Sequence, residues 1–181
     1  MSNIWVISDT HFHHENILRF VDKDGKLVRG NHFSTVDEMD ETILENWNSV
    51  VKPGDIVYHL GDVMMGEQQH FIKFWRRLNG KKRLILGNHD DAKFFAKHEL
   101  VSKILMWRMF PEFGLVLSHV PMHNDSLWRY PSKDNPDMEK VPLLNIHGHL
   151  HQNPSPTEQH RNVCVEHINY TPVNIEELRI T

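Results

Sequence analysis

The amino-acid sequence predicts an α/β layered fold, in which short buried strands alternate with amphipathic helices. Five short apolar runs are each followed at once by polar residues, and helix-like periodicity fills the intervals between several of them. Strands separated by helices form layered sheets that gather ligands beyond the carboxyl ends of their strands. The length of 181 residues suits one hydrophobic core, so we expect a single domain over 1–181.

The amino-terminal part predicts one strand and a peripheral excursion. The apolar run 4–7 ends at Ser8-Asp9, which places Asp9 at a strand end. Asn16 is a candidate N-cap for a helix that begins with Ile17-Leu18. The turn signal Asp24-Gly25 lies inside 21–28, where we expect a peripheral hairpin.

Two amphipathic helices flank the second predicted strand, at 56–60. The first begins at Asp37 and ends before Pro53-Gly54, and the second runs from about Glu67 to Leu78. Further strands are expected at 83–86, 115–117 and 143–146, with a short helix around Phe94-Phe95. Residues 162–165 and 173–178 add strand-like and short helical segments.

The composition restricts the chemistry. A net charge of −4 and a pI near 6.4 argue against a nonspecific nucleic-acid binder, since such proteins carry a basic field. The sequence shows neither a basic leader nor an apolar run of about 18 residues, so we expect no membrane association and a cytoplasmic location. Cys164 is the only cysteine, which excludes an intramolecular disulfide and a thiolate-rich zinc site, whereas 15 histidines favour metals bound through nitrogen and oxygen.

Potential metal ligands follow each of the five apolar runs. Alternate residues of an extended chain share a face about 6–7 Å apart, so Asp9 with His11, and His149 with His151, can each grip one region. Two cations about 3.5–4 Å apart need one shared carboxylate, for which we choose Asp62. The complete set of potential metal ligands or proton donors comprises Asp9, His11, Asp62, Asn88, His89, His119, His149 and His151.

These residues stand in five motifs that resemble the calcineurin-like metallophosphoesterase signature. The motifs are Asp9-Thr10-His11, Gly61-Asp62, Gly87-Asn88-His89-Asp90, Ser118-His119 and Gly148-His149-Leu150-His151. The segment that starts at Asp9 also resembles the beginning of small bacterial and phage phosphohydrolases. The resemblance implies a four-layer α/β/β/α sandwich.

The resemblance also implies roles for the motif residues. One metal would be held by Asp9, His11, Asp62 and His151, and the other by Asp62, Asn88, His119 and His149. The two metal ions would be manganese, iron, zinc, cobalt or nickel, with manganese favoured. They would activate a bridging water for attack on phosphorus, while His89 protonates the departing alkoxide.

Two positions depart from the family pattern. Met65 stands where the family often has an aspartate that orients the catalytic histidine, so Asp90, Asp91 or a backbone carbonyl remains to orient His89. Ser118 replaces a glycine that often precedes the next histidine, which is a small change.

Substrate contacts are expected at the edge of the site. His14 either contacts a substrate phosphate or caps the following helix. The segment 122–142 contains Trp128, Arg129 and Tyr130, and is either a lid that stacks on a base or an ordinary surface loop. His59 and His147 are expected to be structural, and Lys73, Arg76 and Arg77 to form a solvated helix face.

The predicted activity is hydrolysis of a small phosphate ester, with a nucleotide-like phosphodiester preferred over a phosphomonoester. The alternative from another class is a noncatalytic scaffold that binds a protein partner. A nuclease is disfavoured by the acidic charge. The oligomeric state and natural substrate are not predicted.

Overall fold

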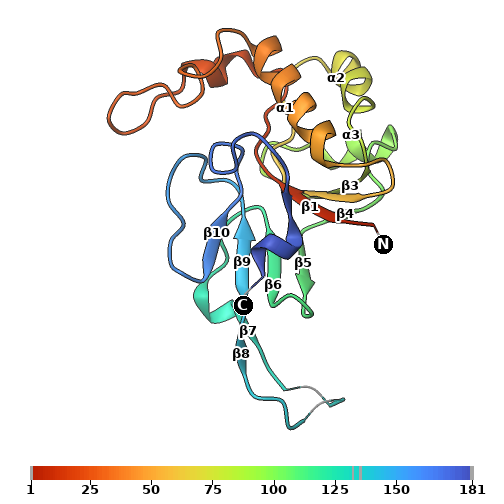
Figure 1. Cartoon of the computed structure of the whole chain (residues 1–181), viewed down its shortest axis with the longest axis vertical. Helices are drawn as coiled ribbons and strands as arrows, with labels where there is room; N and C mark the ends of the chain where they lie inside the picture. Colours follow the sequence, from red (N-terminus) through yellow and green to blue (C-terminus); the bar gives the residue numbers. More distant parts are fainter. Residues whose placement is uncertain (1, 132, 135, 180–181) are drawn as a thin grey trace.

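Two β-sheets pack face to face in the computed structural model, which describes residues 2–131, 133–134 and 136–179. The first sheet has five strands in the order β11-β1-β2-β3-β4, and the second has four in the order β10-β9-β6-β5 (Figure 1). The strands of the first sheet are β1 (Ile4–Ile7), β2 (Ile56–His59), β3 (Lys81–Ile85), β4 (Ile104–Leu105) and β11 (Val173–Asn174). Those of the second are β5 (Trp107–Phe110), β6 (Leu115–Ser118), β9 (Leu144–His147) and β10 (His160–Asn162).

Most neighbouring strands run parallel. β1, β2, β3 and β4 are parallel, and only β11 is antiparallel within the first sheet. In the second sheet β6, β9 and β10 are parallel, and β5 is antiparallel to β6. Because parallel strands finish at one edge, the segments that leave β1, β2, β3, β6 and β9 can meet there.

Three α-helices cover the outer face of the first sheet, as Figure 1 shows. They are α1 (Val36–Val50), α2 (Gln68–Trp75) and α3 (Ala92–Lys97). A second apolar core, which includes Val6, Leu60, Leu117 and Ile146, fills the space between the sheets. On the outer face of the second sheet, Val116 packs against Leu127 and Leu143 beside the 3-10 helix η2 (Asn124–Ser126). The predicted α/β fold of the metallophosphoesterase type is confirmed, with a fourth layer that is thin across the described residues.

Local sequence explains α1. Thr35 is the N-cap, and its side chain accepts a hydrogen bond from the Glu38 backbone N–H. The predicted apolar stripe is buried at Met39, Ile43, Leu44 and Trp47. The helix thus begins one residue before the predicted start.

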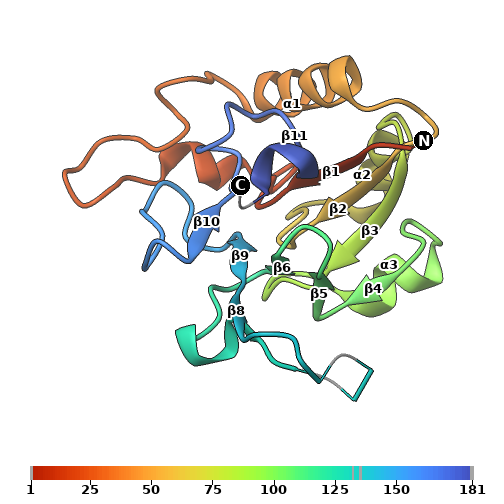
Figure 2. The ribbon, with the colours of Figure 1, turned by 60° about the horizontal axis from the view of Figure 1, so that its bottom comes forward.

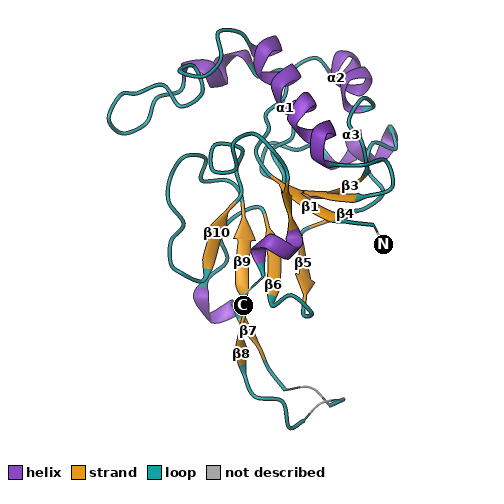
Figure 3. Ribbon diagram, viewed as in Figure 1, coloured by secondary structure: helices purple, strands orange, loops and turns teal. Residues whose placement is uncertain are grey.

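The largest differences from the predicted elements lie before α1. The helix expected after Asn16 is the 3-10 helix η1 (Glu15–Arg19), and His14 rather than Asn16 occupies its N-cap position. The segment 21–28 forms one isolated bridge, between Val21 and Leu27, in place of a full hairpin. Figure 3 shows the chain between η1 and α1 as a long loop that reaches away from the sheets.

Two further differences concern the strands and the far end of the molecule. The strand expected at 162–165 is found at His160–Asn162, and β4 and β5 were not predicted. A two-stranded hairpin of β7 (Trp128–Arg129) and β8 (Val141–Pro142) precedes β9 and lies at its amino end (Figure 2). Among the described residues, none forms a helix with the length and apolar character needed to cross a membrane.

Candidate metal centre

The segments that follow β1 and β2 run side by side beyond the sheet. The backbone N–H of Asp9 donates to Gly61 O at 3.0 Å, and that of His11 donates to Asp62 O at 3.1 Å. Ser8 also forms a bridge with Cys164, which connects this edge to the segment after β10. These hydrogen bonds bring the side chains of Asp9, His11 and Asp62 to one place beyond the ends of the strands.

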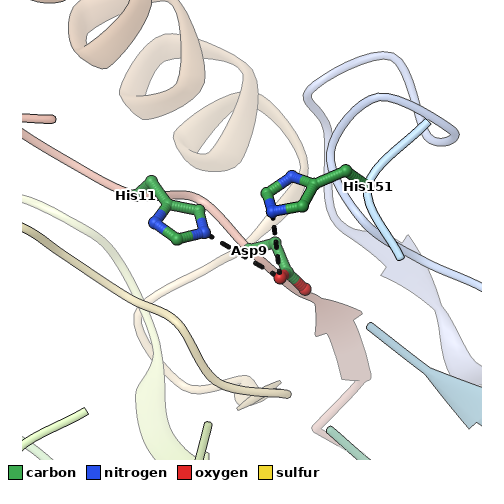
Figure 4. A group of neighbouring side chains, drawn as sticks. All are labelled: Asp9, His11 and His151. Carbon is green, nitrogen blue, oxygen red and sulfur yellow. Dashed lines mark ion pairs between the residues drawn. The ribbon is translucent and has the colours of Figure 1, made fainter. Parts of the chain in front are cut away.

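The first group of potential ligands contains Asp9, His11 and His151. The Nε2 atoms of His11 and His151 lie 4.0 Å and 3.9 Å from Asp9 Oδ1. Figure 4 shows both imidazole rings directed at this oxygen from different segments of the chain. One ligand atom from each residue lies within 4.8 Å of the others, a separation that suits a shared cation.

The second group contains Asp62, His119 and His149, whose ligand atoms also lie within 4.8 Å of one another. His119 Nε2 is 3.5 Å from Asp62 Oδ2, 2.9 Å from Asn88 Oδ1 and 3.3 Å from His149 Nδ1. Asn88 therefore joins this group through its side-chain oxygen.

Asp62 connects the two groups. Its Oδ2 lies 3.8 Å from His11 Nε2 as well as 3.5 Å from His119 Nε2. Its other oxygen accepts a hydrogen bond from the His89 backbone N–H at 2.9 Å. The carboxylate thus stands between the groups, as the sequence pattern predicted for a shared ligand.

The backbone at these positions is strained. Asp9, His11, Asp62, His149 and His151 all have left-handed backbone, with φ of 56°, 49°, 54°, 68° and 47°. This conformation is unfavourable for residues other than glycine, and it persists where surrounding contacts enforce it. The concentration of such residues at one edge is typical of a functional site.

Close approach of two segments requires glycine at Gly148. A Cβ atom there would collide with the Ser8 hydroxyl and with Asp9 Oδ2. Without it, the His149 backbone N–H donates to Asp9 Oδ2 at 2.8 Å. The glycine therefore lets the segment after β9 approach Asp9 closely.

The electrostatics of the first group fit a cation. Asp9 Oδ1 and both ring nitrogens of His11 are buried without a hydrogen-bond partner among the described residues. Burial above all, with the charge of Arg29, keeps the pKa of His11 far below its usual range, so its ring is neutral. Neutral imidazole is the form that coordinates metals, and a bound cation would satisfy these orphaned atoms.

A buried network that the sequence interpretation missed supports this group. The Arg29 side chain is completely buried, and it donates to the carbonyls of Asp9 and Thr10 and to Glu166. Glu166 Oε1 in turn lies 3.1 Å from His151 Nδ1. Burial opposes protonation of His151, yet Glu166 and Asp9 together raise its pKa. The excursion before α1 is thus tied to the candidate centre rather than wholly peripheral.

His89 lies at the exposed side of the centre. Its ring centroid is 6.0 Å from that of His11, and its ring makes no hydrogen bond within the described residues. Asp90 does not orient it, since the Asp90 carboxylate accepts N–H groups of Asp62, Val63 and Gly87. Asp91 instead caps α3. Both carboxylates considered as orienting groups therefore have other roles.

The remaining predicted residues fall at different distances from the centre. The His14 ring lies 5.6 Å from the His11 ring, at the edge of the site, and its side chain makes no capping hydrogen bond. Trp128 and Arg129 belong to β7, which lies at the opposite end of β9 from the centre (Figure 1), so the position of β7 favours the surface-loop alternative over a lid above the centre. His59 and His147 are fully buried, in keeping with structural roles.

Comparisons with known proteins agree with this geometry. A family model described as calcineurin-like phosphoesterase matches residues 2–171. The chain belongs to the calcineurin-like phosphoesterase family. Membership supports metal-dependent hydrolysis of phosphate esters as its general chemistry.

Three proteins resemble this chain over most of their length. An uncharacterized protein of Methanocaldococcus jannaschii is 32% identical over 188 residues, which cover 97% of this chain and 89% of that protein. The Gene 66 protein of Mycobacterium phage L5 is 31% identical over 177 residues, which cover 83% of this chain and 78% of that protein. The crystal structure of a protein of unknown function from Aquifex aeolicus aligns with a TM-score of 0.69 and 31% identity over 98% of both chains.

Proposed function

We propose that this protein binds two metal ions, with manganese favoured, and hydrolyses small phosphate esters. Asp9, His11 and His151 would hold one ion, Asn88, His119 and His149 the other, and Asp62 both. The observation that carries the proposal is the pair of ligand groups joined through one carboxylate. Its oxygen and imidazole donors suit manganese, iron, zinc, cobalt or nickel.

The chain's own residues supply the proton for the leaving group. When bound, two such cations neutralise charge on the phosphoryl oxygens and acidify a water molecule. His89 holds a proton on its ring at the open side of the centre and gives it to the departing oxygen as the phosphorus–oxygen bond breaks. Its exposed position, next to Asn88, which is also exposed, supports this role.

Access to the centre favours a small ester. Asp9, His11, Asp62 and His119 are buried, whereas Asn88, His89 and His149 are exposed. A substrate therefore approaches from the side on which these three residues lie. The neutral Asn88 adds an oxygen donor without a further negative charge, which favours an anionic phosphate ester.

Metal analysis and a substrate panel test the proposal. We expect protein loaded with Mn²⁺ to retain about two ions after gel filtration and to hydrolyse aryl phosphodiesters faster than the matching monoesters. Protein that binds the metal but hydrolyses no phosphate ester would support the scaffold alternative. Retention of fewer than one ion would contradict the proposed centre.

The leaving group tests the role of His89. His89→Ala should slow hydrolysis of esters with poor alkoxide leaving groups by about 10²–10⁴-fold. Esters that release p-nitrophenolate, which needs little protonation, should be affected much less. His123→Ala is the matched control, since the His123 side chain is 80% exposed. Equal slowing of both ester types would contradict general-acid catalysis by His89.

A further inference from the structure

A cavity of about 460 Å³ opens beside the candidate centre. One wall contains His149 and His151, which belong to different ligand groups. The opposite wall is formed by η1 and the excursion that follows it, and includes Arg19 and Phe20. The volume lies within the range of small-molecule sites, and the cavity borders both groups.

Phe20 presents an aromatic ring to this cavity. Its side chain is 49% exposed, and its ring lies 5.6 Å from the His14 ring, which in turn lies 5.6 Å from the ring of His11. Val21, on the same wall, is 55% exposed. A line of rings therefore leads from the centre to an exposed apolar surface.

The wall is fixed to the centre. The backbone N–H of Val28 donates to Phe20 O at 2.8 Å, so the two ends of the excursion are hydrogen-bonded to each other. The next residue, Arg29, is buried and donates to the Asp9 carbonyl. The position of Phe20 is thus coupled to the segment that carries the ligands.

Charge distinguishes this cavity from its neighbour. Among the described residues that line it, Glu166 is the only acidic one and is paired with Arg29, whereas no described acidic group pairs with Arg19. The neighbouring cavity, of about 580 Å³, contains Glu15, Asp37 and Glu67. An anionic substrate is therefore drawn toward Arg19 and repelled from the acidic cavity.

His89 faces a third and smaller cavity. Its volume is about 220 Å³, and it shares no lining residue with the cavity of Phe20. A group that leaves beside His89 and a group that stays on phosphorus would therefore occupy separate spaces. Two spaces of this kind suit a phosphodiester, which has two organic substituents.

We propose that the cavity of Arg19 and Phe20 binds the retained, ring-bearing group of a phosphodiester, with a nucleoside as the group that fits best. Phe20 stacks on the ring and Arg19 attracts the anion. The proposal rests on the proposed hydrolysis: water adds to phosphorus, the bond to the leaving oxygen breaks, and His89 protonates that oxygen. The retained ester bond stays intact, so the products are a nucleoside monophosphate and an alcohol.

Two substrates with one leaving group test the subsite. Mn²⁺-loaded protein should hydrolyse the p-nitrophenyl ester of thymidine 5′-monophosphate with a higher kcat/KM than methyl p-nitrophenyl phosphate. Phe20→Ala should lower kcat/KM at least about fivefold more for the thymidine ester than for the methyl ester, because only the thymidine ester loses stacking on a base. Phe20→Tyr keeps a ring and should keep the preference. Tyr130→Ala removes a ring that is 57% exposed at the far end and should change neither.

A binding measurement separates the subsite from catalysis. By isothermal titration calorimetry, Phe20→Ala should weaken the binding of thymidine 5′-monophosphate at least about fivefold more than the binding of inorganic phosphate. Ring-dependent binding without hydrolysis of either ester would refute the proposed function and keep the subsite. Hydrolysis of both esters with the same kcat/KM, or equal losses for both in Phe20→Ala, would overturn the subsite and keep the proposed function.

Discussion

Replacement of Arg29 by methionine should destabilise the protein more than replacement of any exposed arginine. The guanidinium is fully buried, and two of its donors lie 2.8 Å and 2.7 Å from Glu166 Oε1. Burial alone raises the pKa of Glu166, yet Arg29 first and then His151 lower it to about 2, so the carboxylate is charged at neutral pH. Arg29→Met leaves this charge without its main partner.

The expected magnitude follows from the loss of one partner of a buried ion pair. Such a loss costs about 3–5 kcal/mol, which is a large share of the roughly 5–15 kcal/mol by which a domain is stable. The double variant Arg29→Met with Glu166→Gln removes both charges, so it should lose at least about 1 kcal/mol less than Arg29→Met alone. Both values refer to the free energy of unfolding at pH 7.

Urea unfolding followed by tryptophan fluorescence measures these values. EDTA in the buffer removes any contribution of bound metal. Arg77→Met is the matched control, because Arg77 pairs with Glu41 at 2.6 Å while both side chains are about half exposed, and it should cost at most about 1 kcal/mol. A loss below about 1 kcal/mol for Arg29→Met, or a double variant that is no more stable than the single one, would refute the reasoning.

Three other perturbations have defined outcomes. Gly148→Ala should weaken Mn²⁺ binding at least about tenfold by calorimetry, because the new methyl group displaces Asp9, while Gly54→Ala, with open space around it, should not. Burial lowers the pKa of His59 to about 3, so the folded state loses stability as pH falls from about 6.5 toward 3. His59→Gln should reduce the stability lost between pH 6.5 and 4.5 by about 2 kcal/mol in EDTA, and an unchanged loss would contradict a buried neutral ring. Thr35→Ala should cost about 1 kcal/mol of unfolding free energy through the lost cap of α1, and no change would exclude the cap.

The order of strands and helices could be predicted because it depends on local patterns. The apolar stripe of α1 and the buried runs of β1 and β2 are written in consecutive residues. The gathering of the potential ligands could also be predicted, because each follows a strand and parallel strands finish at one edge of a sheet. The weakest predictions concern 15–28, where 3-10 and turn structure has no strong periodicity.

By itself, the sequence indicated the family through its five motifs and named the residues of the two groups of potential ligands, because these short motifs lie directly after buried strands. Only the tertiary structure decided which other residues support or face the centre. Arg29 and Glu166 are 137 residues apart, and no local pattern predicts a pairing over such a separation. For the same reason, the aromatic and basic residues around Trp128 allowed a lid as one alternative. The direction of β9 instead places Trp128 at the end of that strand away from the centre. Long-range packing sets these positions, and it acts through contacts that a linear pattern does not contain.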